Sequence, residues 1–241
     1  MTQHRTVRAT FPAILIGIVL IGSFVLASDQ NRNSVNGTIW VANRGTHTIR
    51  GFDAVTGAIV RTVAMADNSQ PGDLAYAKGY LYVAEEFATA PAVAIVDPET
   101  GQIVGRIFVP AGSRPHHVHA SNGGNLIGVG LFGTDLVAVI DTHTNQLLGP
   151  WDTNPQTTNG RIHAAVFSHD GRTLYLTSDA TNEVIAIDPY DGELFWRMTV
   201  AGAHELAVTH NGKIAYVTRR TANRLAVIDL EDRTFEDVAT L

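Results

Sequence analysis

Short apolar runs recur along this chain, separated by polar stretches rich in glycine, asparagine and aspartate. The clearest runs end in an aspartate, and these aspartates follow one another at intervals of 44, 44, 47 and 41 residues. The five runs are Arg50-Gly51-Phe52-Asp53, Ala94-Ile95-Val96-Asp97, Ala138-Val139-Ile140-Asp141, Ile185-Ala186-Ile187-Asp188 and Ala226-Val227-Ile228-Asp229. A near-constant period of this length indicates a repeat protein in which each unit is one small group of elements.

Each unit contains further strand-like runs. Upstream of the aspartate lies a run rich in β-branched and aromatic residues, such as Tyr80–Ala84, and further upstream lies another, such as His116–Ser121. A turn after the aspartate leads into a fourth run, such as Gln102–Val109. Asparagine or aspartate followed by glycine, the strongest short hairpin signal, separates the first run from the second at Asn122-Gly123, Asp170-Gly171 and Asn211-Gly212. Four strands per unit joined by tight turns predict propeller blades.

We therefore predict an all-β fold, a β-propeller of about five four-stranded blades with no helices in the mature chain. The first unit has no convincing first strand, because residues 29–36 are polar and turn-like. That leaves 19 predicted strands. Since a ring removes exposed sheet edges only when it closes, three arrangements stay open. They are a five-bladed ring, an open or incomplete ring, and a part of a larger ring that another chain completes.

The N-terminal segment has the features of an export signal. Arg5 and Arg8 precede an apolar, uncharged run over residues 11–27, which ends in small residues. A run of 17 residues is also at the short end of the range that spans a membrane, so an uncleaved anchor is the alternative. We assign residues 1–28 to a signal peptide or N-terminal membrane anchor and residues 29–241 to the propeller. Both alternatives predict a periplasmic or extracellular location, with or without anchoring to the membrane.

Composition excludes several functional classes. The 241 residues include no cysteine, which removes disulfides, thiolate metal sites and a cysteine nucleophile. The formal net charge is −6, and −8 without residues 1–28, with no clustered basic surface for a nucleic acid. The sequence also lacks a phosphate-binding glycine-rich loop and a Gly-x-Ser-x-Gly elbow.

The repeat resembles the YVTN-repeat β-propellers of exported prokaryotic proteins. The resemblance rests on Pro115–Ser121, on Ser168–Tyr175 and on Tyr216-Val217-Thr218, and it covers residues 38–241. It implies the propeller fold, whereas such propellers serve as binding platforms, surface proteins and enzyme domains. Two departures stand out. The relatives commonly carry about seven blades, and the complete haem-contacting set of the similar propeller of nitrite reductases cannot be placed here.

Three histidines occupy one equivalent position of the repeat, at the start of the innermost strand: His116, His163 and His204. In a propeller this position lies near one mouth of the central channel, so three imidazoles could converge there as ligands of a transition metal such as zinc or copper. His117, His119 and Glu205 are neighbours that could bind a ligand or orient the imidazoles. The alternative is structural, because the family repeat favours Pro-His here and the imidazole then bonds to a neighbouring blade.

Other polar residues have simpler interpretations. The five repeated aspartates are expected to accept hydrogen bonds from the backbone and fix the turns that follow them. Glu85 and Glu86 are expected to form a solvated loop pair. Trp151 lies in the longest departure from the repeat, residues 148–161, where it either packs against a blade or faces a ligand.

Nothing in the sequence nominates a catalytic nucleophile. The function that we expect is an exported binding or scaffold module for a partner protein or a small ligand. One alternative is a metal-dependent enzyme or redox domain with the histidine cluster at the channel mouth, which a bound metal would favour. The other is a structural subunit of a membrane or cell-surface assembly, tethered by the N-terminal apolar segment.

Overall fold

The computed structural model describes residues 25–26, 36–87, 90–153 and 160–240. Its strands form five antiparallel sheets, and each sheet is built from one consecutive stretch of the chain, as predicted for propeller blades. The strands are β1 (Val25–Leu26), β2 (Thr38–Asn43), β3 (Thr48–Asp53) and β4 (Ile59–Ala64) in blade 1; β5 (Pro71–Ala77), β6 (Tyr80–Glu85), β7 (Ala92–Val96) and β8 (Ile103–Phe108) in blade 2; β9 (Pro115–Ala120), β10 (Leu126–Leu131), β11 (Leu136–Asp141), β12 (Gln146–Leu147) and β13 (Trp151–Asp152) in blade 3; β14 (Ile162–Phe167), β15 (Leu174–Ser178), β16 (Glu183–Ile187) and β17 (Leu194–Thr199) in blade 4; and β18 (Ala203–Val208), β19 (Ile214–Arg219), β20 (Arg224–Asp229) and β21 (Thr234–Thr240) in blade 5.

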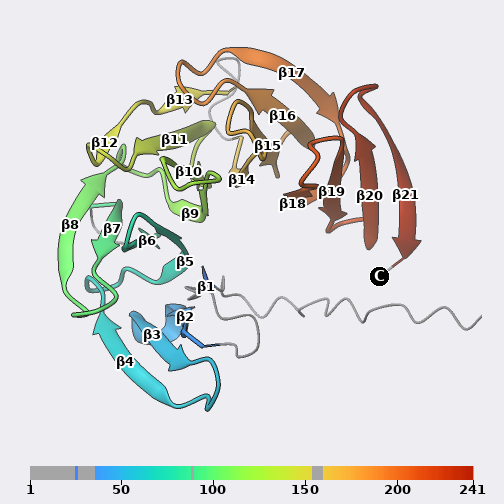
Figure 1. Cartoon of the computed structure of the whole chain (residues 1–241). Helices are drawn as coiled ribbons and strands as arrows, with labels where there is room; N and C mark the ends of the chain where they lie inside the picture. The colour runs from blue at the N-terminus through green and yellow to red at the C-terminus, as the bar shows by residue number, and fades with distance from the viewer. Residues whose placement is uncertain (1–24, 27–35, 88–89, 154–159, 241) are drawn as a thin grey trace, which may run out of the picture.

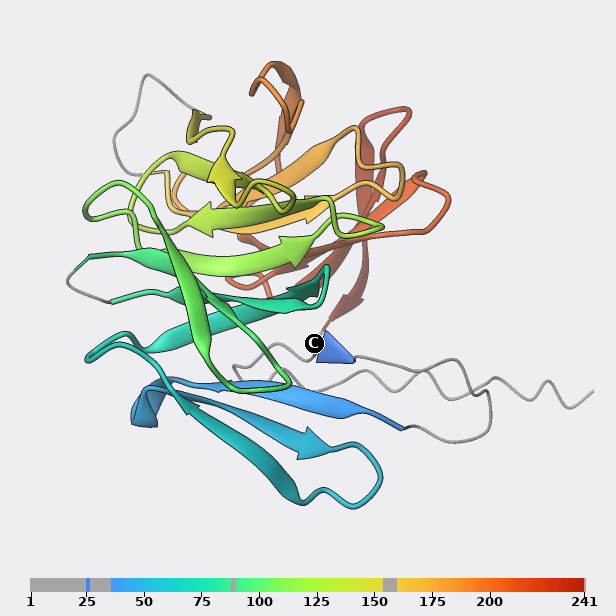
Figure 2. The ribbon, with the colours of Figure 1, turned by 60° about the vertical axis from the view of Figure 1, so that its left-hand side comes forward.

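The blades stand side by side in an arc, with the first strand of each nearest the centre and the last strand at the periphery (Figure 1). The view in Figure 2 shows successive blades stacked face to face. A sector without a blade separates β21 from blade 1 (Figure 1), and within the described residues no sheet joins the first and last blades. The five blades of the described residues therefore form an open ring, which agrees with an incomplete ring and with a part of a larger ring that another chain completes.

Blade 1 differs from the sequence prediction. Its innermost strand is β1, in which Val25 pairs with Trp40 and Leu26 with Ile39. The prediction that this strand is missing was wrong, because the pairing segment is separated from β2 by eleven residues and lies beyond the polar stretch. Since β1 lies inside residues 1–28, the boundary of the predicted signal or anchor stays a prediction, and most of that segment is outside the described residues. The described residues contain one short 3-10 helix, Arg44–Thr46, and no α-helix.

The hydrophobic core lies between the blades. Each strand alternates its side chains between its two faces, so a blade presents one apolar set to the preceding blade and another to the following one. Four clusters result, one at each blade-to-blade contact. Tyr82, Ile127 and Leu174 are among the fully buried side chains. Burying a side chain of this size stabilises the fold by about 1.5–3 kcal/mol, so the blades hold one another in place and fix the geometry at the centre.

The aspartates that mark the repeat fix turns, as predicted. Asp53 accepts hydrogen bonds from the backbone N–H groups of Val55 (3.0 Å) and Thr56 (2.7 Å). The bonds from Thr56 lower the pKa of this carboxyl. Backbone N–H groups two residues on bind the other four in the same way: Asp97, Asp141, Asp188 and Asp229. The predicted asparagine-glycine and aspartate-glycine turns form as well, with positive φ at Gly123, Gly171 and Gly212.

Within the described residues, no helix has the length and apolar character needed to cross a membrane.

Candidate functional site

The inner strands of blades 2 to 5 share a β-bulge near their start. In β14, Ile162 pairs with Ser178 and Ala165 with Leu176, so two residues of β14 lie opposite Thr177 alone. The same shift occurs in β5, β9 and β18. The bulge pairs are Gly72-Asp73, His116-His117, His163-Ala164 and His204-Glu205. A bulge breaks the alternation of a strand and re-aims side chains, which explains why adjacent residues such as His204 and Glu205 both reach the same site.

Hydrogen bonds from neighbouring strands hold these bulges. The N–H of Ala164 donates to the hydroxyl of Thr177 (3.0 Å), and that hydroxyl donates to the carbonyl of His204 in the next blade. The N–H of Glu205 donates to the hydroxyl of Thr218 (2.9 Å). Because buried backbone groups must be paired, these threonines stabilise the irregular backbone that carries the histidines.

Between blades 2 and 3 a carboxylate, that of Asp73, pairs with the backbone N–H groups. Oδ2 of Asp73 accepts a hydrogen bond from the N–H of Val118 (2.8 Å), and Oδ1 accepts one from the N–H of Leu74 (2.6 Å). Burial raises the pKa of Asp73 to about 7, against the lowering effect of these two donors and of His116.

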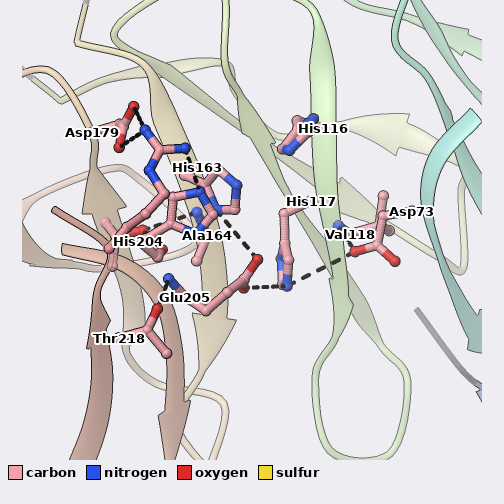
Figure 3. Close-up of polar contacts among 12 residues, drawn as sticks. Asp73, His116, His117, Val118, His163, Ala164, Asp179, His204, Glu205 and Thr218 are labelled. Atoms are coloured by element: carbon pink, nitrogen blue, oxygen red, sulfur yellow. Dashed lines mark hydrogen bonds and ion pairs between the residues drawn. The ribbon is translucent and has the colours of Figure 1, made fainter. Parts of the chain in front are cut away.

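His163, His204 and Glu205 form the centre of the cluster (Figure 3). The imidazole centroids of His163 and His204 are 3.7 Å apart. Nδ1 of His163 is 3.6 Å from Oε1 of Glu205 and has no hydrogen-bond partner, although the residue is only 4% exposed. One potential ligand atom from each of the three residues lies within 4.8 Å of the others.

His116 and His117 flank this centre. The ring of His116 is 4.8 Å from that of His163, and its Nδ1 is 3.0 Å from Oε2 of Glu86. Nε2 of His117 lies 3.7 Å from Oε2 of Glu205 and 3.8 Å from Oδ2 of Asp73. The repeat register thus correctly placed His116, His163 and His204 together, and metal binding by this set stays a prediction.

Three imidazoles, those of His117, His163 and His204, favour the uncharged state. Burial, together with the neighbouring His204 and His116, lowers the pKa of His163 to about 2. Burial also lowers the pKa of His117 and of His204. Neutral imidazoles keep a nitrogen lone pair, which is the form that binds metals and accepts hydrogen bonds.

The prediction for Glu85 and Glu86 was wrong, since both side chains are buried. Oε1 of Glu86 is 2.6 Å from Nη2 of Arg114, and its Oε2 is 2.7 Å from Nη2 of Arg44. Glu85 pairs with Arg106 at 2.8 Å. The sequence could not reveal this burial because the arginines come from other parts of the chain: the 3-10 helix of blade 1, β8, and the segment just before β9.

A cavity of about 550 Å³ lies along the channel side of blades 3 to 5. His119 lines it, and Nδ1 of this residue accepts a hydrogen bond from the N–H of Phe167 (3.4 Å). Burial lowers the pKa of His119 to about 4. The lining residues are His117, His119, Ala120, Asn122, Val166, Phe167, Ser168, His169, Leu206, Ala207, Val208, Thr209 and His210.

Trp151 does not join the cluster or the cavity. It lies in β13, where it packs against the core of blades 3 and 4, and its indole N–H donates to the carbonyl of Pro189 (3.2 Å). The following part of the predicted loop, residues 154–159, lies outside the described residues.

A second histidine pair was not singled out from the sequence. His169 and His210 follow the other ends of β14 and β18, their ring centroids are 3.6 Å apart, and both are exposed. The signal was present, because these residues are separated by 41 positions, as are His163 and His204.

Solved structures with this fold have diverse activities. The chain is similar to Kuenenia stuttgartiensis hydrazine synthase (TM-score 0.70, 21% identity), over 83% of this chain and 62% of that one. It is similar to a streptogramin B lyase (TM-score 0.71, 14% identity), over 84% and 65%. The third is the periplasmic gluconolactonase PpgL of Pseudomonas aeruginosa (TM-score 0.66, 19% identity), over 84% and 66%. At these identities the likeness shows the fold alone.

The chain thus spans less than two thirds of the length of each of these three proteins. No curated protein sequence matches it. The resemblance to YVTN-repeat propellers stays a resemblance. A family model does match residues 90–235, which is more than half of the chain, and on this match the protein belongs to the family described as outer membrane protein assembly factor BamB.

Proposed function

We propose that this protein is an extracytoplasmic binding module that takes a small ligand into the channel cavity. The observation that carries this proposal is the 550 Å³ cavity, whose size is typical of small-molecule sites. Two comparisons support the location. The family description names an outer-membrane factor, and one structural neighbour is described as periplasmic.

The lining favours an uncharged aromatic ligand. None of the lining residues is an aspartate, glutamate, lysine or arginine. The imidazoles offer flat surfaces for stacking, and His119 with its lowered pKa is uncharged at neutral pH. Asn122 and Thr209 supply hydrogen-bonding groups at one end.

Filling the cavity tests the proposal. Ala207 lines the cavity and is exposed in β18, so Ala207→Trp blocks the space without crowding the core. The probes are benzimidazole and adenine, measured by saturation-transfer NMR and by thermal shift. Val104→Trp on the outer strand β8, where Val104 is 54% exposed, is the matched control. We expect binding to the wild type and to the control, and its loss in Ala207→Trp. Equal binding by both variants, or none by the wild type, would contradict the proposal.

Binding of a partner protein is the second candidate, and the family description as an assembly factor favours it. The channel mouth is the expected contact, where exposed Arg161 lies 5.9 Å from the ring of Phe132. A photoreactive amino acid at position 161 should cross-link the partner, and one at exposed Tyr190 should not. Equal cross-linking at both positions would argue against the mouth.

A further inference from the structure

We infer that His163, His204 and Glu205 form a binding site for a divalent ion of the first transition row. The site lies at the channel mouth, and it does not depend on which ligand the cavity takes. Two imidazoles and one carboxylate are a ligand set that holds zinc or iron(II) while leaving positions open for water or substrate.

The spacing of the donors supports this assignment. Two ligands of a tetrahedral zinc ion, each about 2.1 Å from the metal, are about 3.4 Å from one another. Nδ1 of His163 and Oε1 of Glu205 are 3.6 Å apart, which is too far for a hydrogen bond and close to that separation. The three residues together present their ligand atoms within 4.8 Å.

A buried, unpartnered nitrogen is the second observation. Nδ1 of His163 has no hydrogen-bond partner in a residue that is 96% removed from solvent. Buried polar atoms in folded proteins are almost always paired, so an unpaired one calls for an explanation. A metal ion bound between His163 and Glu205 would satisfy this nitrogen.

The inferred ligand set differs from the set predicted from the repeat. His116 occupies the equivalent position in blade 3, but its Nδ1 faces Oε2 of Glu86 at 3.0 Å. Glu205 takes its place because the bulge of β18 turns this carboxylate toward His163. Nε2 of His117 lies 3.7 Å from the other carboxylate oxygen of Glu205, and His117 is outside the group of three residues whose ligand atoms lie within 4.8 Å of one another.

One cation opposes the metal. Nη1 of Arg220 donates a hydrogen bond to Nε2 of His204 (3.1 Å), and Asp179 holds the same guanidinium through two contacts of 3.0 and 3.1 Å. Metal binding through Nε2 of His204 would displace Arg220. Asp179 partly neutralises the positive charge of this arginine. Because the metal must compete with Arg220 for His204, we expect the affinity for the metal to be moderate.

The test uses Zn²⁺ alone as the probe and the full chain freed of metal with a chelator. Isothermal titration should show one zinc ion per chain. Glu205→Gln should weaken binding at least tenfold, and His163→Ala at least a hundredfold. The side chain of Glu205 is 34% exposed and that of His163 is buried, so Glu205→Gln disturbs the packing less than His163→Ala and tests the site even where His163→Ala lowers stability.

The second histidine pair provides the matched control. His169→Ala with His210→Ala removes an equally close imidazole pair and should change zinc affinity less than twofold. Ala207→Trp should block aromatic probes and keep zinc, so that the failure of one proposal is distinguishable from failure of the other. Absence of stoichiometric zinc binding by the wild type, or loss of binding in the control as large as in Glu205→Gln, would overturn the assignment.

Discussion

Two histidine pairs stand at opposite ends of β14 and β18, and their surroundings differ. His163 and His204 lie in bulges within the strands, with ring centroids 3.7 Å apart and Glu205 3.6 Å from Nδ1 of His163. His169 and His210 lie in the turns after the strands, with centroids 3.6 Å apart, and both are exposed. Among the described residues, only the first pair belongs to a group that could hold a metal. Two histidine pairs with the same spacing therefore need not form equivalent metal sites, because the backbone conformation determines which third side chain lies beside each pair.

The largest effect on the first histidine pair is expected from Gly130→Ala. Gly130 lies in β10 opposite the bulge of β9, and a Cβ there would stand 2.3 Å from the carbonyl oxygen of His163. Since that neighbour is backbone, β14 must shift at its start. We expect a loss of about 2–3 kcal/mol in unfolding free energy and of zinc binding, measured by urea denaturation and titration.

The turn at the far end of β14 should not change in this variant. This turn serves as an internal control for the variant, because the NMR signals of His169 and His210 should keep their wild-type positions. Zinc binding as tight as that of the wild type would show that the bulge of β14 does not set the site.

A smaller effect is expected from Thr177→Val. Thr177 is fully buried, and its hydroxyl pairs with the N–H of Ala164 and the carbonyl of His204. Valine has the same shape but leaves both groups unpaired, which should cost about 2 kcal/mol of unfolding free energy. Thr209→Val, beside the second pair, should cost less than about 1 kcal/mol because Thr209 is half-buried and water can replace its hydroxyl. Equal costs at the two positions would contradict this account.

The regular part of this architecture could be predicted from the sequence. The spacing of the aspartates predicts five units, and the turn that each aspartate fixes involves residues only two or three positions away. The same register predicts that His116, His163 and His204 share one end of the inner strands. Such features depend on local chemistry or on repetition, and both are visible along a single chain.

The site itself depends on contacts that the pattern does not carry. Simple alternation would turn Glu205 away from the face that holds His204, and only the pairing of β18 with β19 shows the bulge that brings both together. The burial of Glu86 likewise depends on Arg44 and Arg114, which come from blade 1 and from the start of blade 3. The innermost strand of blade 1 was missed because a stretch with no strand pattern separates it from β2.

Asn122→Asp should convert the second histidine pair into a zinc site. Nδ2 of Asn122 lies 3.3 Å from Nε2 of His169, so aspartate would place a carboxylate beside two close imidazoles. We expect a second zinc ion to bind, at least tenfold tighter than any binding to this pair in the wild type, which corresponds to about 1.4 kcal/mol. The measurement is zinc titration in a Glu205→Gln background, where the first site is weakened. If no second ion binds, proximity of two imidazoles and a carboxylate is insufficient here.

The smallest expected effect concerns the cation beside the first pair. Arg220→Gln removes the guanidinium that donates to Nε2 of His204, and it leaves the second pair unchanged. Because Arg220 is exposed and Asp179 already offsets its charge, the gain should be only about threefold in zinc affinity, in the range of exposed ion pairs. The gain should shrink at high salt, since screening weakens the repulsion between Arg220 and the metal. Weaker zinc binding in this variant would mean instead that Arg220 positions His204, and that its hydrogen bond supports the site rather than competing with the metal.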